Sequence, residues 1–163
     1  MVMTLNGLAK LTEEIGELIQ VAGKKMAYAD GTHPDGKGDL NSRMQEEMGD
    51  VVAAIAFVSK KLKLDVIAIS AISEHELAAT ILNGLPHLAK SLGTLSYSAS
   101  NAICAICGRG QKSDEDGILE HRMGLVLASI NLVAKELSLD HQAIAARAAR
   151  KVWQYESWDR QKP

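Results

Sequence analysis

The sequence predicts an all-α fold, a helical bundle built from two tandem helical units. Helix-favouring Ala, Leu, Ile, Lys and Glu dominate the long segments, and the chain holds only 3 prolines. Apolar residues recur at helical spacing through most of its length. No segment combines sustained apolar–polar alternation with β-branched side chains, the pattern that is typical of a strand. These observations together favour helices throughout.

The expected helices follow from this periodicity and from the turn residues that interrupt it. Residues 29–38 combine Gly, Asp and Pro and predict a loop. The residues 83–86, Asn-Gly-Leu-Pro, predict the clearest boundary within the chain. In order, the expected helices are Met3 to Tyr28, one capped by Asp39 or Asn41 and ending near Leu62, one capped by Asp65 and ending near Leu82, Pro86 to Cys107, Ile118 to Leu137, and Asp140 to Tyr155.

Size and charge exclude several classes of function. A chain of 163 residues suits one compact domain, and a net charge of −2 gives no electrostatic argument for binding nucleic acid or an anionic membrane. No apolar run approaches the roughly 18 to 20 residues of a membrane helix. The first residues lack the pattern of a secretory signal, so a cytoplasmic protein is expected.

The two cysteines, Cys104 and Cys107, form a CxxC pair. A structural zinc site needs four such ligands, and the sequence has no second pair. A redox pair is expected between a strand and a helix, whereas this one falls in an apparently helical stretch. Buried thiols on a helix are therefore expected.

An internal duplication emerges when the chain is compared with itself. At an offset of 75 positions, the segment 48–71 matches 123–146, with 13 of 24 pairs identical. Upstream, Leu8-Ala9-Lys10 matches Leu88-Ala89-Lys90 at an offset of 80. The sequence thus predicts one domain of two helical units, residues 1–83 and 84–163.

The two copies differ in their acids. Glu13, Glu14 and Glu17 align with Gly93, Thr94 and Tyr97, whereas Glu46, Glu47 and Asp50 align with His121, Arg122 and Leu125. Every one of these acids is therefore lost in the second copy, although the apolar scaffold is kept. This asymmetry indicates that the carboxylates have a role that only the first copy performs.

The acids lie in two closely similar motifs, Glu13-Glu14-Ile15-Gly16-Glu17 and Glu46-Glu47-Met48-Gly49-Asp50. A spacing of three residues places Glu14 beside Glu17, and Glu47 beside Asp50, on their helices. If the two helices pack antiparallel, four carboxylates converge and repel one another unless a cation lies among them. Hard oxygen ligands of this kind favour Mg²⁺, for which Mn²⁺ can substitute. A solvated acidic helix face without a metal is the alternative.

Basic residues follow the first motif along the same helix. Lys25 lies on the same side of the helix as Glu14, and Lys24 on that of Glu17. A lysine beyond a metal site can contact phosphate oxygens. Arg43, one turn before Glu47, is expected to be ordinary surface charge.

The residues Glu14-Ile15-Gly16-Glu17 and Glu47-Met48-Gly49-Asp50, separated by a loop, resemble the ExxE and ExxD signature of the MazG-like all-α nucleoside triphosphate pyrophosphohydrolases. The resemblance covers about residues 5 to 72. It implies a four-helix core and hydrolysis of a nucleoside triphosphate to a monophosphate and pyrophosphate. It also implies magnesium bound by Glu14, Glu17, Glu47 and Asp50, Glu13 or Glu46 orienting the attacking water, and a phosphate contact from Lys25 or Lys24.

The resemblance leaves several questions open. Family analogy implies a homodimer. Because the second unit of this chain is acid-free, one active site per chain is expected, with residues 86–155 supplying the opposite wall of the pocket. The preferred base is not fixed, although a deoxynucleotide such as dGTP, dUTP or dCTP fits a role in the nucleotide pool. The candidates for stacking on the base are Tyr28, Tyr97, Trp153 and Trp158. The competing interpretations are a non-catalytic bundle that binds a nucleotide or a partner, and a phosphoribosyl-ATP pyrophosphohydrolase.

Overall fold

The computed structural model describes residues 5–28, 35–71, 87–107 and 115–160. Within these ranges all regular structure is helical, which confirms the predicted all-α class. A helical segment also occupies residues 66–71. The long helices are α1 Leu5–Ala27, α2 Leu40–Leu62, α4 His87–Cys107, α5 Glu115–Glu136 and α6 His141–Arg160.

Helix α2 begins and ends where the sequence predicts. Asp39 has an extended backbone, and its carboxylate accepts a hydrogen bond of 2.8 Å from the backbone N–H of Ser42. This bond satisfies one of the free donors at the helix start, and it lowers the pKa of Asp39. The helix ends at Leu62. The capping residue Lys63 has a φ of 58°, in the left-handed region, and the N–H of Leu64 then bonds back to the carbonyl of Ser59.

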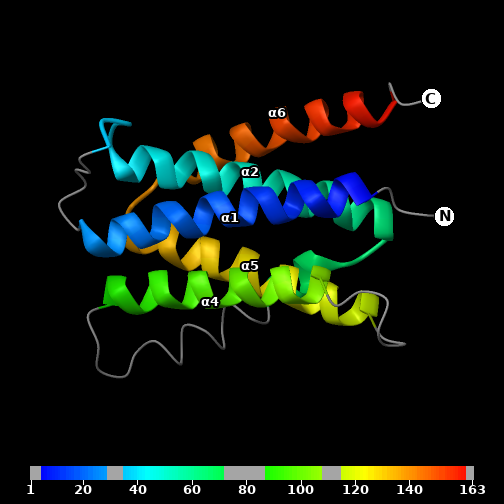
Figure 1. Cartoon of the computed structure of the whole chain (residues 1–163), viewed down its shortest axis with the longest axis horizontal. Helices are drawn as coiled ribbons and strands as arrows, with labels where there is room; N and C mark the ends of the chain where they lie inside the picture. The colour runs from blue at the N-terminus through cyan, green and yellow to red at the C-terminus, as the bar shows by residue number, and fades with distance from the viewer. Residues whose placement is uncertain (1–4, 29–34, 72–86, 108–114, 161–163) are drawn as a thin grey trace.

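The helices form a bundle with one additional layer (Figure 1). Helix α1 packs against α2 and α4, and α5 packs against α4 and α2, so these four helices enclose the core. Helix α6 lies along the outer side of α2. Figure 1 shows that α1 and α2 run in opposite directions, as the convergence of their acids requires. The largest fully buried side chains include Leu11, Ile15, Leu18, Met44, Met48, Leu92, Leu95, Leu119 and Met123.

The two halves make reciprocal contacts at the ends of their helices. The backbone N–H of Asp140, before α6, donates to the side-chain oxygen of Gln45 in α2 at 3.0 Å. The backbone N–H of Asp65, before the segment 66–71, donates to the carboxylate of Glu120 in α5. Gln45 and Glu120 are 75 positions apart, and so are Asp65 and Asp140. Each half therefore places the start of its third helix on the second helix of the other half.

The turns before these third helices are also equivalent. Ser138 has a φ of 52°, close to the 58° of Lys63 at the corresponding position. The N–H of Leu139 bonds to the carbonyl of Ala134 at 2.8 Å, as the N–H of Leu64 does to Ser59 at 3.0 Å. These positions correspond at the offset of 75 residues that the sequence repeat has. The repeat in the sequence thus has a counterpart in local backbone geometry.

Helix α6 is longer than predicted. It continues past Tyr155 to Arg160, although residues 156–160 carry no regular apolar repeat. Two ion pairs with the end of α2 hold this turn: Glu156 with Lys60, and Asp159 with Lys61. Contacts with α2, which is distant in sequence, therefore stabilise a last turn of α6 that the local sequence pattern does not predict.

The prediction for the CxxC pair was wrong. Cys104 and Cys107 are both exposed and neither forms a disulfide. The buried stripe of α4 passes through Leu95, Ala99 and Ala102, and the two thiols fall outside it. Most of the third helix of the first unit and the boundary at 83–86 lie outside the described residues.

Contrary to the expectation from the sequence, one segment of α5 is long and apolar enough to cross a membrane by length and composition. It spans Gly117–Glu136, and 56% of it is buried inside the molecule. Its residues Leu119, Met123 and Val126 are fully buried against the other helices. A core helix has this same composition, which matches the position of α5 in the bundle.

Candidate metal centre

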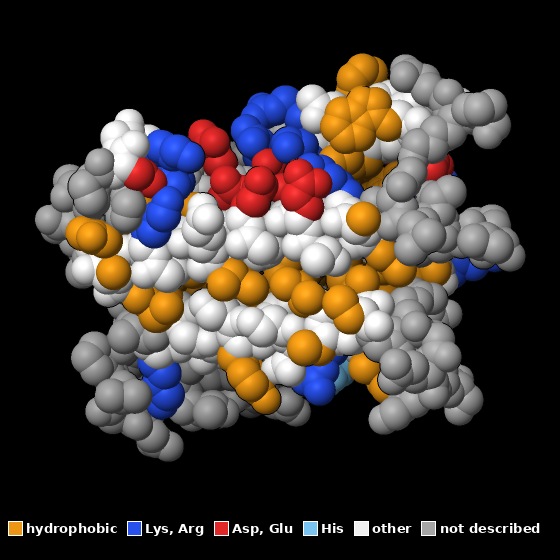
Figure 2. All heavy atoms as spheres, viewed as in Figure 1, with side chains coloured by type: hydrophobic (Ala, Val, Ile, Leu, Met, Phe, Trp, Pro, Cys, Tyr) orange, Lys and Arg blue, Asp and Glu red, His pale blue; other side chains and the backbone are white. Residues whose placement is uncertain are grey.

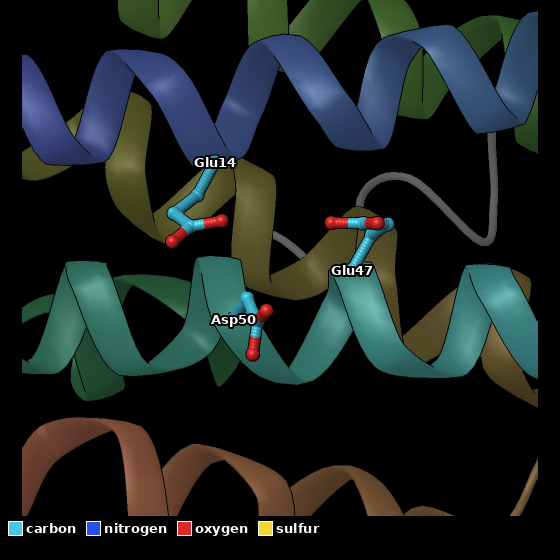
Figure 3. Close-up of side chains that lie close together, drawn as sticks. All are labelled: Glu14, Glu47 and Asp50. Atoms are coloured by element: carbon cyan, nitrogen blue, oxygen red, sulfur yellow. The ribbon is translucent and has the colours of Figure 1, made fainter. Parts of the chain in front are cut away.

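Three of the predicted carboxylates converge between α1 and α2. Glu14, Glu47 and Asp50 each offer an oxygen, and these atoms all lie within 4.8 Å of one another. Figure 3 shows Glu14 pointing from α1 toward α2 and Glu47 pointing from α2 toward α1. Glu14 is 1% exposed and Asp50 is 3% exposed. The packing of α1 against α2 therefore brings together acids from both sequence motifs.

The apolar pattern of α1 explains why Glu14 is buried. Leu11 and Leu18 precede and follow Glu14 by three and four residues, so all three share one face of the helix. Both leucines are fully buried. Glu14 thus occupies a position in the core stripe at which a large apolar side chain is usual.

The centre has an oxygen without a partner. Glu14 Oε2 is buried and has no hydrogen-bond partner among the described residues. A buried polar atom of this kind is costly and is found where a ligand, ion or water completes the site. It is an observation independent of the clustering of acids, and it points to a bound group.

Mutual repulsion also shows in the acid–base properties of the centre. Burial, together with the charges of Glu17, Asp50 and Glu14, raises the pKa of Glu47 from 4.5 to about 7. Burial and the neighbouring Glu14 likewise raise the pKa of Glu17. Glu17 and Glu47 therefore lie among like charges, without enough neighbouring positive charge to balance them.

Asp50, in contrast, is fully paired with cations from α6. Arg147 donates from Nε to Oδ1 at 2.7 Å and from Nη2 to Oδ2 at 2.8 Å, which makes a two-pronged ion pair. Lys151 Nζ lies 2.9 Å from Oδ2. Burial would raise the pKa of Asp50, but the hydrogen bonds from Arg147 and Lys151 outweigh it and lower that pKa.

Glu14 has partners on its other oxygen. Tyr155 of α6 donates its hydroxyl hydrogen to Glu14 Oε1 at 2.8 Å, and Lys10 Nζ lies 2.9 Å from the same atom. Burial and this bond to Glu14 raise the pKa of Tyr155. The ring of Tyr155 in turn contacts Phe57 and Trp158 at centroid distances of 5.9 and 5.8 Å.

The sequence did not identify Arg147, Lys151 or Tyr155 as site residues. The apolar periodicity of the segment that contains them predicts a helix, but it does not specify which helix this segment packs against. One signal was available at the offset of 75 positions: Arg147 aligns with Ile72, and Lys151 with Glu76. The second copy thus has cations at two positions where the first has none, and the fold brings these cations to the carboxylates that only the first copy has.

The other predicted acids lie around the centre. Glu17 is exposed beside Glu14 and lies outside the group whose oxygens share the 4.8 Å limit. Glu13 is paired with Lys10 at 3.0 Å, and Glu46 lies 3.9 Å from Arg147 Nη1. Their side chains are 55% and 60% exposed, respectively. Both are thus at the rim of the centre.

The predicted phosphate contacts, Lys24 and Lys25, lie in the last turn of α1, beyond Glu14. Lys24 forms an ion pair of 2.7 Å with Asp35, which also binds Arg43 at 3.1 Å. Lys25 is 4% exposed. Arg43 is therefore part of a charge network with Lys24, rather than the ordinary surface charge that the sequence suggested.

The four stacking candidates are all exposed: Tyr28 at 40%, Tyr97 at 69%, Trp153 at 67% and Trp158 at 53%. Trp158 is the candidate that the structure connects to the centre, through its contact with Tyr155. Beside this aromatic group lies a cavity of about 360 Å³, lined by Phe57 and by charged side chains at the ends of α2 and α6.

The donor set fits a hard divalent cation. Mg²⁺ takes oxygen ligands and commonly binds through one or two carboxylates. Glu47 and the unpartnered Oε2 of Glu14 supply carboxylate oxygens from two helices. Asp50 completes the group, although both of its oxygens already accept hydrogen bonds from α6. Figure 2 shows the acidic side chains in one band on this face, with Lys and Arg side chains directly beside them.

Comparison of the chain with protein-family models, with curated proteins and with solved structures gave no match. The resemblance to the MazG-like pyrophosphohydrolases therefore rests on the motif residues, and what it implies about function stays a prediction.

Proposed function

We propose that the protein is a magnesium-dependent nucleoside triphosphate pyrophosphohydrolase of the MazG-like type, which converts a (deoxy)nucleoside triphosphate and water to the monophosphate and pyrophosphate. One observation carries the proposal: Glu14, Glu47 and Asp50 present oxygens within 4.8 Å of one another, from the two motifs that the resemblance requires. The unpartnered Oε2 of Glu14 supports it, because a buried oxygen without a hydrogen-bond partner is available to a ligand.

The chain's own residues would divide the work of this reaction. Glu14, Glu47 and Asp50 would hold Mg²⁺, with Glu17 beside them. Bound Mg²⁺ would supply neutralisation of phosphate charge and a water of lowered pKa. Glu13 and Glu46, at the rim, are placed where a carboxylate can orient a water molecule. The cations around the acids would attract and orient the anionic substrate.

A non-catalytic helical module is the second candidate, and one observation favours it. Asp50 is already neutralised by Arg147 and Lys151, so part of the acidic cluster has a structural role in joining α2 to α6. In this case the acids would stabilise packing and no reaction would follow. The raised pKa of Glu47 argues against a purely structural role, because packing alone is better served by an uncharged side chain.

The test is release of pyrophosphate from a panel of ribo- and deoxynucleoside triphosphates, extended with phosphoribosyl-ATP, in the presence of Mg²⁺. The proposal expects equal amounts of monophosphate and pyrophosphate from at least one substrate. Formation of a diphosphate and inorganic phosphate would contradict the assigned bond cleavage. Absence of turnover with every compound would favour the binding module.

A substitution in the centre distinguishes turnover by this protein from turnover by a contaminating enzyme. Glu47→Gln keeps the shape of the side chain but removes its charge, so turnover should be lost while helix content is retained. Glu136→Gln, which changes an exposed acid of α5, is the matched control and should keep full activity. Equal activity of both variants at saturating Mg²⁺ would show that Glu47 is not a metal ligand.

A further inference from the structure

The ion pair between α2 and α6 makes competing demands on one carboxylate. Asp50 accepts hydrogen bonds from Arg147 on both oxygens and from Lys151 on Oδ2. The same carboxylate belongs to the group that fits a divalent cation. Each oxygen has two lone pairs, and those of Oδ2 are both engaged by α6. Oδ1 keeps one lone pair, but Asp50 cannot bind a metal ion through both oxygens and keep all its contacts with α6.

Releasing the two cations without a new partner would be costly. Asp50 is 3% exposed, and breaking a buried pair leaves an uncompensated charge in a region of low dielectric. A divalent cation bound by Asp50 would compensate the carboxylate, and an incoming anion would give Arg147 and Lys151 new partners. A triphosphate brings several negative oxygens, and the planar guanidinium of Arg147 matches a phosphate as well as a carboxylate.

The two cations are positioned to turn toward such an anion. Arg147 and Lys151 lie one helical turn apart on the same face of α6. Their side chains are 31% and 24% exposed, so both reach solvent beside the carboxylates. The long side chains can therefore leave Asp50 without moving α6 itself.

We propose that Arg147 and Lys151 exchange Asp50 for the phosphates of the substrate when the metal binds, so that metal and triphosphate bind cooperatively. This inference rests on the proposed function, since it assigns substrate contacts to the same centre. In the free protein, α6 masks one ligand of the metal. In the loaded protein, Asp50 would be a ligand of the metal, and Arg147 and Lys151 would contact the triphosphate. By linkage, each ligand strengthens the binding of the other by the same factor.

The exchange predicts that one substitution changes the affinities for metal and for triphosphate in opposite directions. Arg147→Met removes the cation that competes for Asp50 but keeps the aliphatic stem that packs on α2. Without nucleotide, Mn²⁺ should bind this variant about tenfold more tightly than the wild type. Inorganic triphosphate at saturating Mn²⁺ should bind it at least about tenfold more weakly. Calorimetry measures the second affinity, and electron paramagnetic resonance of free Mn²⁺ measures the first.

The control is Arg150→Met on the same helix, which changes an exposed arginine and should shift neither affinity. Lys151→Met is the second variant and should show the same two signs. It also tests the inference if Arg147→Met fails to fold by circular dichroism.

Three results would overturn the exchange. Weaker Mn²⁺ binding in both variants would mean that the cations only hold the centre together. Unchanged Mn²⁺ affinity would mean that they do not compete for Asp50. Tighter Mn²⁺ binding with unchanged affinity for triphosphate would mean that they do not contact phosphate. Failure of the proposed function is a separate result, since opposite shifts in affinity together with no turnover would leave the exchange standing and remove the hydrolase.

Discussion

Gly49 of α2 lies directly under the side chain of Arg147 of α6. A Cβ atom on Gly49 would lie 2.6 Å from Arg147 Cγ and 3.1 Å from the backbone oxygen of Ile144. The stem of Arg147 therefore crosses α2 at the one residue of the Glu-Glu-Met-Gly-Asp motif that has no side chain, and its guanidinium reaches Asp50, the next residue. Gly49 thus sets both the approach of α6 and the geometry of the ion pair.

We expect Gly49→Ala to separate α6 from α2 and to break the pairing of Arg147 with Asp50. Overpacking of this kind costs typically about 1–3 kcal/mol in the free energy of unfolding, which urea denaturation measures. Since Arg147 would move away from the centre together with α6, affinity for inorganic triphosphate should fall as well.

Gly124→Ala is the matched control for this variant. Gly124 is the equivalent residue of α5, and a Cβ there would lie 2.5 Å from Ile69 Cγ2. This substitution should cost similar stability without affecting the centre, because the described atoms nearest to that Cβ belong to Ile69 and Ser70, outside the centre. An equal loss of triphosphate affinity in both variants would show that the loss in Gly49→Ala comes from general destabilisation.

Gly16 of the first motif should behave in the opposite way. A Cβ atom there meets nothing within 4 Å, and the residue is exposed in the middle of α1. Alanine is favoured over glycine in a helix interior by about 0.5–1 kcal/mol. Gly16→Ala should therefore raise the free energy of unfolding by about that amount without altering metal affinity, and a loss of stability would mean that an unseen partner packs on this position.

The contrast between Gly16 and Gly49 shows what the sequence can predict. Both glycines occupy the same place in similar motifs, yet only one is required for packing. Their difference depends on α6, which lies about 100 residues further along the chain. Local signals predicted the cap at Asp39, the end of α2 and the convergence of Glu14 with Glu47. Arg147 and Tyr155 could not be placed, because helical periodicity does not specify which helix a face packs against.

The ionisation of Glu47 predicts how stability depends on pH. Burial and the charges of Glu17 and Asp50 raise its pKa from 4.5 to about 7 in the folded protein. Between these values the folded state binds more protons than the unfolded state, so the free energy of unfolding falls as the pH rises. Glu47→Gln cannot ionise and should escape this loss. Without metal, the variant should gain stability relative to the wild type between pH 5 and pH 8.

Urea denaturation in the presence of a chelator at both pH values measures the difference between the two proteins. Millimolar Mg²⁺ should then stabilise the wild type at pH 8 and leave the variant nearly unchanged. A difference that is independent of pH would mean that Glu47 titrates normally.

Tyr155 of α6 connects the rings of Phe57 and Trp158 to the candidate metal centre, and its position there predicts a role in orienting Glu14. Its hydroxyl is buried and donates to Glu14 Oε1 at 2.8 Å, which fixes the carboxylate with Oε2 left for a ligand. Tyr155→Phe keeps the ring contacts with Phe57 and Trp158 but removes this bond. Loss of a hydrogen bond to a charged group costs about 1.5–3 kcal/mol in stability. Loss of a group that orients a metal ligand typically costs about 10–100-fold in metal affinity.

Tyr97→Phe is the control for the loss of a hydroxyl group, since Tyr97 is 69% exposed on α4 and should change stability by no more than about 0.5 kcal/mol. Mn²⁺ affinity without nucleotide distinguishes the possible roles of Tyr155. A loss of stability with unchanged Mn²⁺ affinity would mean that the hydroxyl supports only packing. A loss of both means that Tyr155 holds Glu14 in the orientation that the metal requires. The second half of the chain would then supply an orienting group to a centre whose acids all come from the first half.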